Sequence, residues 1–339
     1  MSTSENKNPN TPTLPHYFPK NAGSPTEESN AQERGTPPNS MHITGTFLDE
    51  ITHDIPSQNW GPAAWARDFD AMQQVGIDTV ILIRAGYRNR STFDSEVLND
   101  HRTMLPAYTD LVDLFLREAA ERDMDFFFGI YDAGAFWDEG DYQTEVDVNK
   151  DFCAEVVERY GDRDAFAGWY ICHEINAYDD SQMRVYEELA DHLRALKDVP
   201  ILMSPYIRGT KQFGENALGL SEHVATWEQV FARIQDHVDI VAFQDGNVPL
   251  PELPRYLKAN RTLASRYGLT SWSNVETFDR DVRIKFPPID YRKLRYKMEQ
   301  ATEAGVDKLI TFEFSHFLSP NADHPAARSL HRWYRSWLE

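Results

Sequence analysis

Two glutamates in this sequence stand where short apolar stretches end, a position suited to acid–base and nucleophilic chemistry. Glu174 follows the apolar residues 166–172, and Glu276 follows residues 270–275. A carboxylate at the C-terminal end of a buried barrel strand points into a cleft. Two such groups on either side of a bond can take different catalytic roles, because one can protonate the departing oxygen while the other, ionised, attacks carbon.

The elements that would position these glutamates follow a repeating pattern. From His42 onward, short apolar runs alternate with amphipathic helical stretches, which is typical of parallel βα units. The predicted strands are residues 42–47, 79–84, 125–131, 166–172, 200–204, 239–243, 270–275 and 308–312. The predicted helices are residues 63–75, 111–122, 146–160, 181–196, 226–237, 254–267, 291–304 and 326–338.

The sequence therefore predicts an α/β protein with a single (β/α)₈ TIM barrel over residues 41–339 and elaborated βα loops. The longer connections, residues 85–108, 132–145, 206–223 and 278–289, all follow strands and would wall a pocket on the catalytic face. Residues 1–40 are rich in Pro, Ser, Thr, Asn and Glu and nearly lack large aliphatic side chains. Because such a segment cannot offset its ordering entropy by burial, we expect a disordered N-terminal tail.

The charge of the chain limits its partners. Its 339 residues carry a formal net charge of −20, from 54 acidic and 34 basic side chains. Such a surface repels phosphates, which argues against nucleic acid or an anionic membrane and suits a neutral or cationic ligand. Neither a membrane-spanning run nor a secretory signal is evident, so the sequence favours a soluble cytoplasmic protein, with export by another route left open.

Cofactor chemistry is not indicated. Cys153 and Cys172 form no CxxC pair and are expected to be buried thiols. Glycine-rich phosphate loops are absent. His173, Asp245 and His316 invite a metal interpretation, but no HExxH or comparable cluster supports it. We therefore expect neither a metal nor another cofactor.

Polar side chains gather at the predicted strand ends and are expected to surround one cavity. Beside the two glutamates, these are Asp49, Glu50, Arg84, Tyr87, Tyr131, Asp132, His173, Gln244, Asp245, Asn274, Glu313 and His316, with Asn176 shortly after Glu174. Aromatic rings on the same face could stack on the C–H faces of sugars. Trp137, in a long acidic loop, and Trp272 are the tryptophans expected there.

Two sequence motifs carry a resemblance to a known group of enzymes. They are Trp-Tyr-Ile-Cys-His-Glu-Ile-Asn, which ends at Asn176, and Trp-Ser-Asn-Val-Glu-Thr-Phe, which begins at Trp272. The pattern resembles the clan A retaining glycoside hydrolases, barrels whose acid/base Glu ends strand four and whose nucleophile Glu ends strand seven. The resemblance implies that Glu174 is the acid/base and Glu276 the nucleophile, with Arg84 beside Glu276 to keep it ionised.

From Thr44 through the last strand, the chain also resembles the family called domain of unknown function number 4434, which is regarded as glycosidase-like. It departs from the clan A pattern at three places. His173 stands where the clan has an Asn that contacts the sugar 2-hydroxyl. Phe312 or Phe314 must replace the usual Trp after strand eight. The Tyr of strand six is missing, and Gln244 is its nearest substitute.

The expected function is hydrolysis of a glycosidic bond in a carbohydrate, and two alternatives stay open. An inverting hydrolase could pair Glu174 with Asp245 or Asp132, because inversion needs carboxyls about 6.5–9.5 Å apart, against about 5–5.5 Å for retention. A barrel that binds carbohydrate without turnover is the other alternative. For either glutamate, and for an Arg84–Glu276 pair, a purely structural salt bridge also remains an interpretation.

Overall fold

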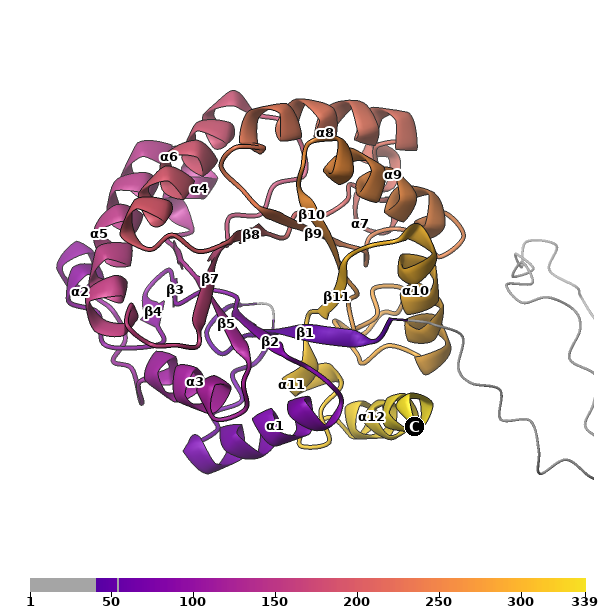
Figure 1. Ribbon diagram of the computed structural model, residues 1–339, viewed down its shortest axis with the longest axis horizontal. Coiled ribbons are helices and arrows are strands. Elements are labelled where there is room, and N and C mark those ends of the chain that lie inside the picture. The colour runs from indigo at the N-terminus through magenta and orange to yellow at the C-terminus, as the bar shows by residue number, and fades with distance from the viewer. Residues whose placement is uncertain (1–40, 54) are drawn as a thin grey trace, which may run out of the picture. The chain divides into compact units, whose positions relative to one another are not determined.

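The chain folds as a closed barrel of eight parallel strands surrounded by helices, in the order β1-β11-β10-β9-β8-β7-β5-β2 (Figure 1). The computed structural model describes residues 41–53 and 55–339, and the expectation of a tail at 1–40 lies outside them. The barrel strands are β1 (Ile43–Leu48), β2 (Thr79–Leu82), β5 (Asp125–Gly129), β7 (Phe166–Ile171), β8 (Ile201–Met203), β9 (Ile240–Gln244), β10 (Thr270–Asn274) and β11 (Lys308–Thr311). The predicted (β/α)₈ fold is confirmed.

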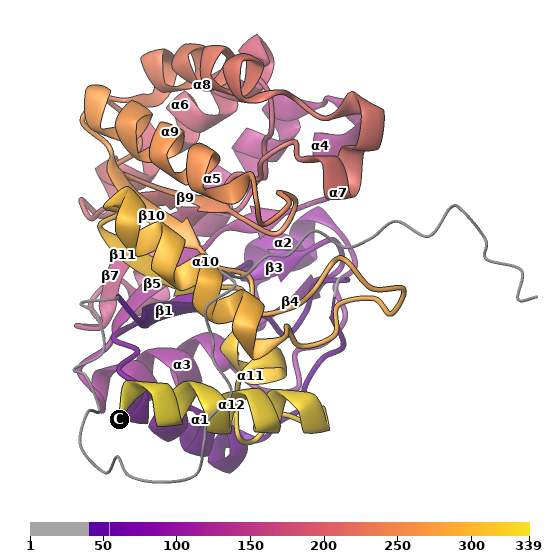
Figure 2. The ribbon, with the colours of Figure 1, turned by 90° about the vertical axis from the view of Figure 1, so that its right-hand side faces the viewer.

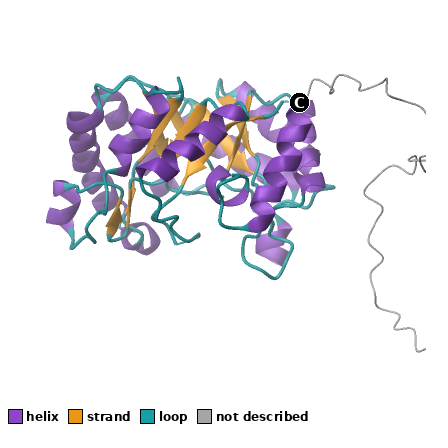
Figure 3. Ribbon diagram, turned by 90° about the horizontal axis from the view of Figure 1, so that it is seen from below, coloured by secondary structure: helices purple, strands orange, loops and turns teal. Residues whose placement is uncertain are grey.

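A layer of long helices covers the outside of the barrel, and Figure 3 shows the strands enclosed by it. These helices are α1 (Pro62–Gln74), α3 (Leu111–Ala120), α5 (Tyr142–Tyr160), α6 (Asp180–Leu196), α8 (Leu220–Ile234), α9 (Leu253–Arg266), α10 (Tyr291–Ala304) and α12 (Pro325–Leu338). Helix α8 begins six residues before the predicted residue 226, because Glu222 accepts a hydrogen bond from the Gly219 backbone N–H at 3.1 Å and so caps an earlier turn.

Local sequence explains where several helices begin and end. Asp110, Asp179 and Asp290 are N-caps of α3, α6 and α10, and each carboxylate accepts backbone N–H groups of the first turn. Gly305 ends α10 with φ +77°, a conformation that glycine adopts without steric cost. Among the described residues, no helix is long and apolar enough to cross a membrane.

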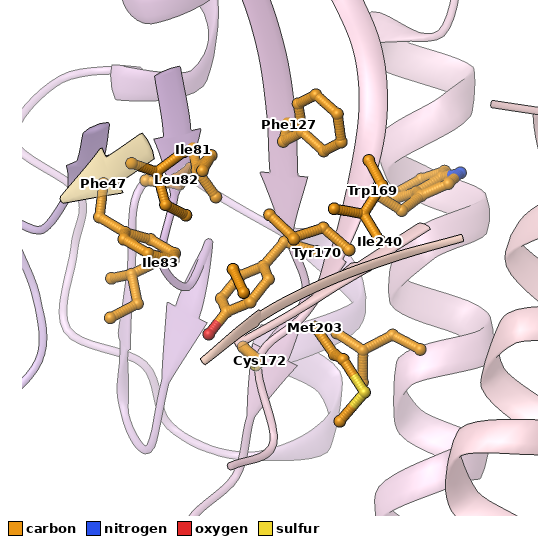
Figure 4. Close-up of a cluster of buried hydrophobic side chains, with 14 of the residues drawn as sticks. Phe47, Ile81, Leu82, Ile83, Phe127, Trp169, Tyr170, Cys172, Met203 and Ile240 are labelled. Carbon is orange, nitrogen blue, oxygen red and sulfur yellow. The ribbon is translucent and has the colours of Figure 1, made fainter. Parts of the chain in front are cut away.

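Side chains from opposite strands meet inside the barrel. Phe47 of β1 packs edge-on against Tyr170 of β7, with ring centroids 5.2 Å apart, although these strands are not neighbours in the sheet (Figure 4). Nearer the N-terminal ends, Phe127 of β5 meets Trp272 of β10 at 5.8 Å. Gly168 makes this possible, because a Cβ there would overlap the Phe127 ring. The barrel interior is therefore filled by side chains.

Short elements lie within the loops that follow the barrel strands. They are β3 (Gly86–Tyr87), β4 (Arg90–Ser91), α2 (Glu96–His101), β6 (Tyr131–Asp132), α4 (Ala135–Glu139), α7 (Thr210–Phe213), the 3₁₀ turn η1 (Gly214–Asn216) and α11 (Phe314–Phe317). Strands β4, β3 and β6 form a separate three-stranded sheet. In Figure 2, α4, α7 and β4 lie toward the same end of the barrel. The predicted long loops thus build structured walls at that end.

Both cysteines, Cys153 and Cys172, are buried and free of disulfide bonding, as the sequence predicted. Burial raises the pKa of both thiols, which keeps them protonated at neutral pH. They act as small apolar side chains of the core.

Candidate active site

A cavity of about 300 Å³ opens at the C-terminal ends of the strands, and both Glu174 and Glu276 line it. Its volume is at the lower end of the range for small-molecule pockets, about 300–1,000 Å³. Part of the wall is apolar or aromatic and consists of Phe47, Ile83, Tyr170, Phe278, Phe286 and Phe312. Another part offers hydrogen-bonding groups from Ser204, Tyr206, Gln212, Gln244, Asn247 and Asn274. One small amphipathic ligand with several hydroxyl groups suits such a wall.

Glu276 is held at both its side chain and its backbone. Its Oε1 accepts a hydrogen bond from Nη2 of Arg280 at 2.8 Å, and its Oε2 accepts one from Nε at 2.9 Å. Its backbone N–H donates to Asp245 Oδ1 at 3.1 Å, and its carbonyl accepts from Lys297 Nζ at 2.8 Å. A two-point pair between guanidinium and carboxylate fixes orientation as well as distance. The carboxylate is therefore fixed in the cavity wall.

Arg280 belongs to the segment that follows β10, residues 277–289, which we call the Arg280 loop. The loop folds back on itself, because Asp279 N–H donates to the Pro287 carbonyl at 2.8 Å and Ile289 N–H donates to the Thr277 carbonyl at 2.9 Å. The Arg280 guanidinium carbon lies 4.8 Å from the ring centroid of Phe278 and 5.4 Å from that of Phe286. Aromatic faces thus support the cation that holds Glu276.

Glu174 projects from the segment after β7 and has different partners. Its Oε1 accepts a hydrogen bond from Nε2 of Gln244 at 2.8 Å, and the same amide donates to the Ser204 carbonyl at 2.8 Å. The chain just before Glu174 is anchored by Tyr186, whose hydroxyl donates to the His173 carbonyl. The two glutamates thus have different hydrogen-bond partners, an amide for Glu174 and a guanidinium for Glu276, while the Arg84 guanidinium also lies near Glu174.

Arg84 lines the cavity, but its ion pair is not the expected one. Its Nε donates to Oδ2 of Asp132 at 2.9 Å, while Arg280 contacts Glu276. Burial alone would lower the pKa of Arg84, but the nearby Asp132, Cys172 and Glu174 groups outweigh burial and raise it. Arg84 follows β2, and Asp132 ends β6, which comes just after β5, the neighbour of β2 in the barrel.

His173 lies outside the cavity wall. Its Nε2 is 2.8 Å from Oε1 of Glu145, and both side chains are fully buried. The ring of Trp137 packs on it, with centroids 4.8 Å apart. Neighbouring residues of an extended chain point to opposite faces, so His173 faces the helix layer when Glu174 faces the cavity. Trp137 thus has a packing partner, which the sequence did not reveal.

Several other predicted residues also lie away from the cavity lining. Tyr131 is fully buried and donates its hydroxyl proton to the Arg88 carbonyl at 2.8 Å. Trp272 is paired with Lys308, the first residue of β11, and lies low in the barrel interior. Asp245 forms a buried ion pair with Lys297 at 2.6 Å.

The remaining predicted residues surround the cavity lining without being part of it. Tyr87 contacts the cavity residue His53, with its hydroxyl oxygen 2.7 Å from Nδ1. Asn176 donates a hydrogen bond to the Tyr206 hydroxyl. His316 contacts Glu313, which caps α11. These groups touch wall residues or the loops behind them.

Of the predicted set, Glu174, Glu276, Arg84, Gln244 and Asn274 are brought together in one wall. Phe312 also lines it, whereas Phe314 is fully buried elsewhere. The wall residues that the sequence did not indicate come mostly from loops: His53, Tyr206, Gln212, Asn247, Phe278, Arg280 and Phe286. The sequence does contain a signal for Arg280, because a guanidinium four residues after a glutamate at a strand end can reach back to that glutamate.

Asp132, Glu145 and His173 place ligand atoms within 4.8 Å of one another, a spacing that could hold a metal ion. Asp132 binds the Arg84 guanidinium, and Glu145 and His173 contact each other, while Oε2 of Glu145 and Nδ1 of His173 are buried without a hydrogen-bond partner among the described residues. The positive charge of Arg84 beside Asp132 opposes a second cation there.

The fold and the site together define the class of this protein, which is a (β/α)₈ barrel with two glutamates in one cavity. The chain belongs to the family described as a domain of unknown function, DUF4434, whose pattern matches residues 43–324. No curated protein matches this chain.

Solved structures provide further relatives. A Bacteroides thetaiotaomicron VPI-5482 protein, described as a "putative alpha-L-fucosidase", is 40% identical with a TM-score of 0.87, over 94% of this chain and 99% of its own. An endo-1,4-beta-D-mannanase from Thermotoga petrophila RKU-1 is 9% identical with a TM-score of 0.56, over 88% and 99%. A glycoside hydrolase family 5 protein from Bacteroides vulgatus ATCC 8482 is 14% identical with a TM-score of 0.51, over 76% and 56%. The last two share the fold.

Proposed function

We propose that this protein is a glycoside hydrolase that cleaves its substrate with retention of configuration at the anomeric carbon. The observation that carries the proposal is that Glu174 and Glu276, from the ends of β7 and β10, line one cavity and have different partners. Retaining hydrolysis requires two carboxyl groups in unequal roles on either side of the scissile bond.

In the first step, a Glu276 carboxylate oxygen attacks the anomeric carbon while Glu174 gives its proton to the departing glycosidic oxygen. The bond between the anomeric carbon and that oxygen breaks, and a glycosyl ester forms on Glu276. In the second step, Glu174 takes a proton from water, and the water oxygen displaces Glu276 from the anomeric carbon. Arg280 orients the attacking carboxylate, and Gln244 orients Glu174.

The identity of the sugar can be narrowed by the cavity and by the most similar solved structure reported above. That relative is described as a "putative alpha-L-fucosidase". Fucose is a 6-deoxy sugar, and its methyl group would suit the apolar wall formed by Phe47, Phe278 and Phe312. Alpha-L-fucosides therefore belong in the first substrate panel, together with glucosides, mannosides and glucuronides.

The inverting alternative receives less support from the contacts. Asp245 does not line the cavity and is engaged by Lys297. Asp132 holds the Arg84 guanidinium and also accepts the Gly134 N–H at 2.8 Å. A catalytic base must reach a water beside the sugar, so Glu276 is the better partner for Glu174.

The test is a screen of 4-nitrophenyl glycosides and oligosaccharides, followed by NMR of the anomer that appears first. Retention gives a first product with the configuration of the substrate, and inversion gives the opposite. We expect Glu276→Gln and Glu174→Gln to lower kcat by about 10²–10⁴-fold or more. Glu96→Gln is the control, because the Glu96 side chain is 92% exposed.

The outcomes separate the three functions. An inverted first product would replace the retaining mechanism with the inverting one. Saturable binding of a glycan without turnover of any probe would favour the carbohydrate-binding barrel. Activity that survives both glutamine substitutions would remove the two residues from the catalytic role.

A further inference from the structure

A second hollow, of about 610 Å³, lies beside the cavity. Three segments bound it: residues 55–58 after β1, residues 285–288 in the Arg280 loop, and residues 316–325 from α11 to the start of α12. Phe286 borders both this hollow and the catalytic cavity. We call the hollow the Phe286 groove, because this residue lines both the hollow and the proposed active site.

Phe286 has an unusual backbone conformation for a bulky residue, with φ +47°. Such a conformation costs about 1–3 kcal/mol and persists only where surrounding contacts impose it. Here the ring packs edge-on against Phe278, with centroids 4.5 Å apart, and the Arg280 guanidinium lies over it at 5.4 Å. The ring is thus held in the wall shared by groove and cavity by the same loop that holds Glu276.

The position of the groove assigns it to one side of the scissile bond. Strands β10, β11 and β1 are consecutive around the closed barrel, and β11, the middle one, lies opposite β7, four strands away in either direction. The groove is therefore on the side of Glu276 that faces away from Glu174. The leaving group must be next to Glu174, which protonates it. If a substrate extends into the groove, the part that lies there is the part that stays attached to the anomeric carbon when the leaving group departs.

The groove has the mixed surface that a sugar ring requires. Phe286, Phe317 and three prolines supply apolar surface for C–H groups, while Gln58, Lys285 and His324 supply hydrogen-bonding groups for hydroxyls. Its volume is about twice the 300 Å³ of the cavity.

We propose that the Phe286 groove binds the sugar unit that precedes the reacting one on the non-reducing side, so that the enzyme prefers substrates longer than a monoglycoside. The inference rests on the proposed glycoside hydrolase function. It makes Phe286, Lys285 and His324 determinants of chain-length preference and gives them no part in bond cleavage.

The test compares substrates that differ only in length: the 4-nitrophenyl monoglycoside that the wild-type enzyme cleaves best, and the di- and trisaccharide glycosides of the same sugar. Asp323→Trp fills the groove from an exposed position on its rim, and Lys285→Ala removes a polar contact. Ile284→Ala is the matched control, because Ile284 is the neighbouring residue of the same loop, is 71% exposed and borders neither hollow.

In the wild-type enzyme, kcat/KM should rise about tenfold or more from the mono- to the disaccharide glycoside, as one added binding contact allows. Asp323→Trp should abolish this rise, Lys285→Ala should reduce it, and Ile284→Ala should keep it. Equal kcat/KM for all lengths, or a full rise in both groove variants, overturns the groove assignment while the hydrolase function stands. Absence of turnover with every probe overturns the hydrolase function and the groove assignment together.

Discussion

Glu276 and Arg280, four residues apart, form a two-point ion pair at 2.8 and 2.9 Å inside the cavity wall. The resemblance to clan A enzymes placed Arg84 in this position, but Arg84 pairs with Asp132. The cation beside the proposed nucleophile therefore comes from the Arg280 loop and not from a barrel strand.

Replacement of Arg280 should reduce catalysis more than binding. We expect Arg280→Met to lower kcat/KM by about 10²–10³-fold, because the carboxylate loses both oriented donors. Arg280→Lys should retain more activity but stay well below the wild type, since an ammonium group cannot make the two-point contact. Steady-state kinetics on the best substrate of the panel measures both.

Arg283→Met is the control for this prediction, because Arg283 is an exposed arginine of the same loop. Wild-type kinetics in Arg280→Met would show that the ion pair does not orient Glu276 during the reaction. An equal loss in Arg283→Met would point to a general effect on the loop.

Gly246 supplies the space that the Glu276 carboxylate occupies. A Cβ at Gly246 would overlap the Glu276 carboxylate and approach Nε of Arg280. Gly246→Ala should therefore displace Glu276 and lower kcat by about 10²-fold or more, as misplacement of a reacting group by about 1 Å does. Circular dichroism and kinetics together separate this local effect from unfolding.

Gly61→Ala provides the comparison, since a Cβ at Gly61 meets nothing within 4 Å and φ there is −79°. That variant should keep wild-type kcat. If Gly246→Ala also keeps wild-type kcat, the carboxylate position seen here is not the one used in catalysis.

The barrel and its two glutamates could be predicted from the sequence because they depend on local patterns. Each strand is a short apolar run, and Glu276 comes directly after one such run while Glu174 comes one residue later than that. The C-terminal ends of the strands converge in a barrel regardless of the conformation of the loops. The presence of Glu174 and Glu276 in one cavity, although they are more than one hundred positions apart, thus followed from topology.

Loop contacts could not be predicted in the same way. Tyr206 and Phe286 reach the cavity because their loops are held by tertiary contacts, such as the bridge between Tyr206 and Gln244. Trp272 shows a different difficulty, because its depth along the barrel axis depends on its register with Lys308. His173 was misplaced because adjacency to Glu174 in sequence means opposite faces in an extended chain.

Lys297 and Asp245 form a buried ion pair behind Glu276, with side chains only 4% and 2% exposed. Burial raises the pKa of Asp245, and Lys297 opposes that shift. Lys297→Met should destabilise the fold by about 3–5 kcal/mol, because it leaves a buried carboxylate without its cation. Urea unfolding followed by tryptophan fluorescence measures the change.

The double variant Asp245→Asn, Lys297→Met should recover much of this loss, since no buried charge then remains unpaired. The exposed pair of Arg335 and Glu339, with side chains 54% and 71% exposed, is the control. Its removal should cost at most about 1 kcal/mol. If the double variant is no more stable than Lys297→Met, desolvation of Asp245 is not the cause of the loss.

His316 makes the stability of the barrel depend on pH on the alkaline side. Its Nδ1 lies 2.6 Å from Oε1 of Glu313 and its Nε2 lies 2.7 Å from the Pro56 carbonyl, so both ring nitrogens face acceptors. Burial lowers the pKa of His316, but the Glu313 carboxylate and these hydrogen bonds outweigh burial and raise it from 6.5 to about 9. The imidazolium form is therefore favoured in the folded protein.

A histidine whose pKa is higher in the folded state stabilises the fold fully below its unfolded value, and the contribution is lost as pH rises through the folded value. The free energy of unfolding should thus fall between pH 6.5 and 9, by up to about 3 kcal/mol from this group. His316→Gln should be less stable than the wild type below pH 6.5, and the difference should vanish above pH 9. Denaturant unfolding at a series of pH values measures it, with the exposed His101→Gln as control. A difference between His316→Gln and wild type that stays constant across this window would show that His316 contributes by packing and not by its charge.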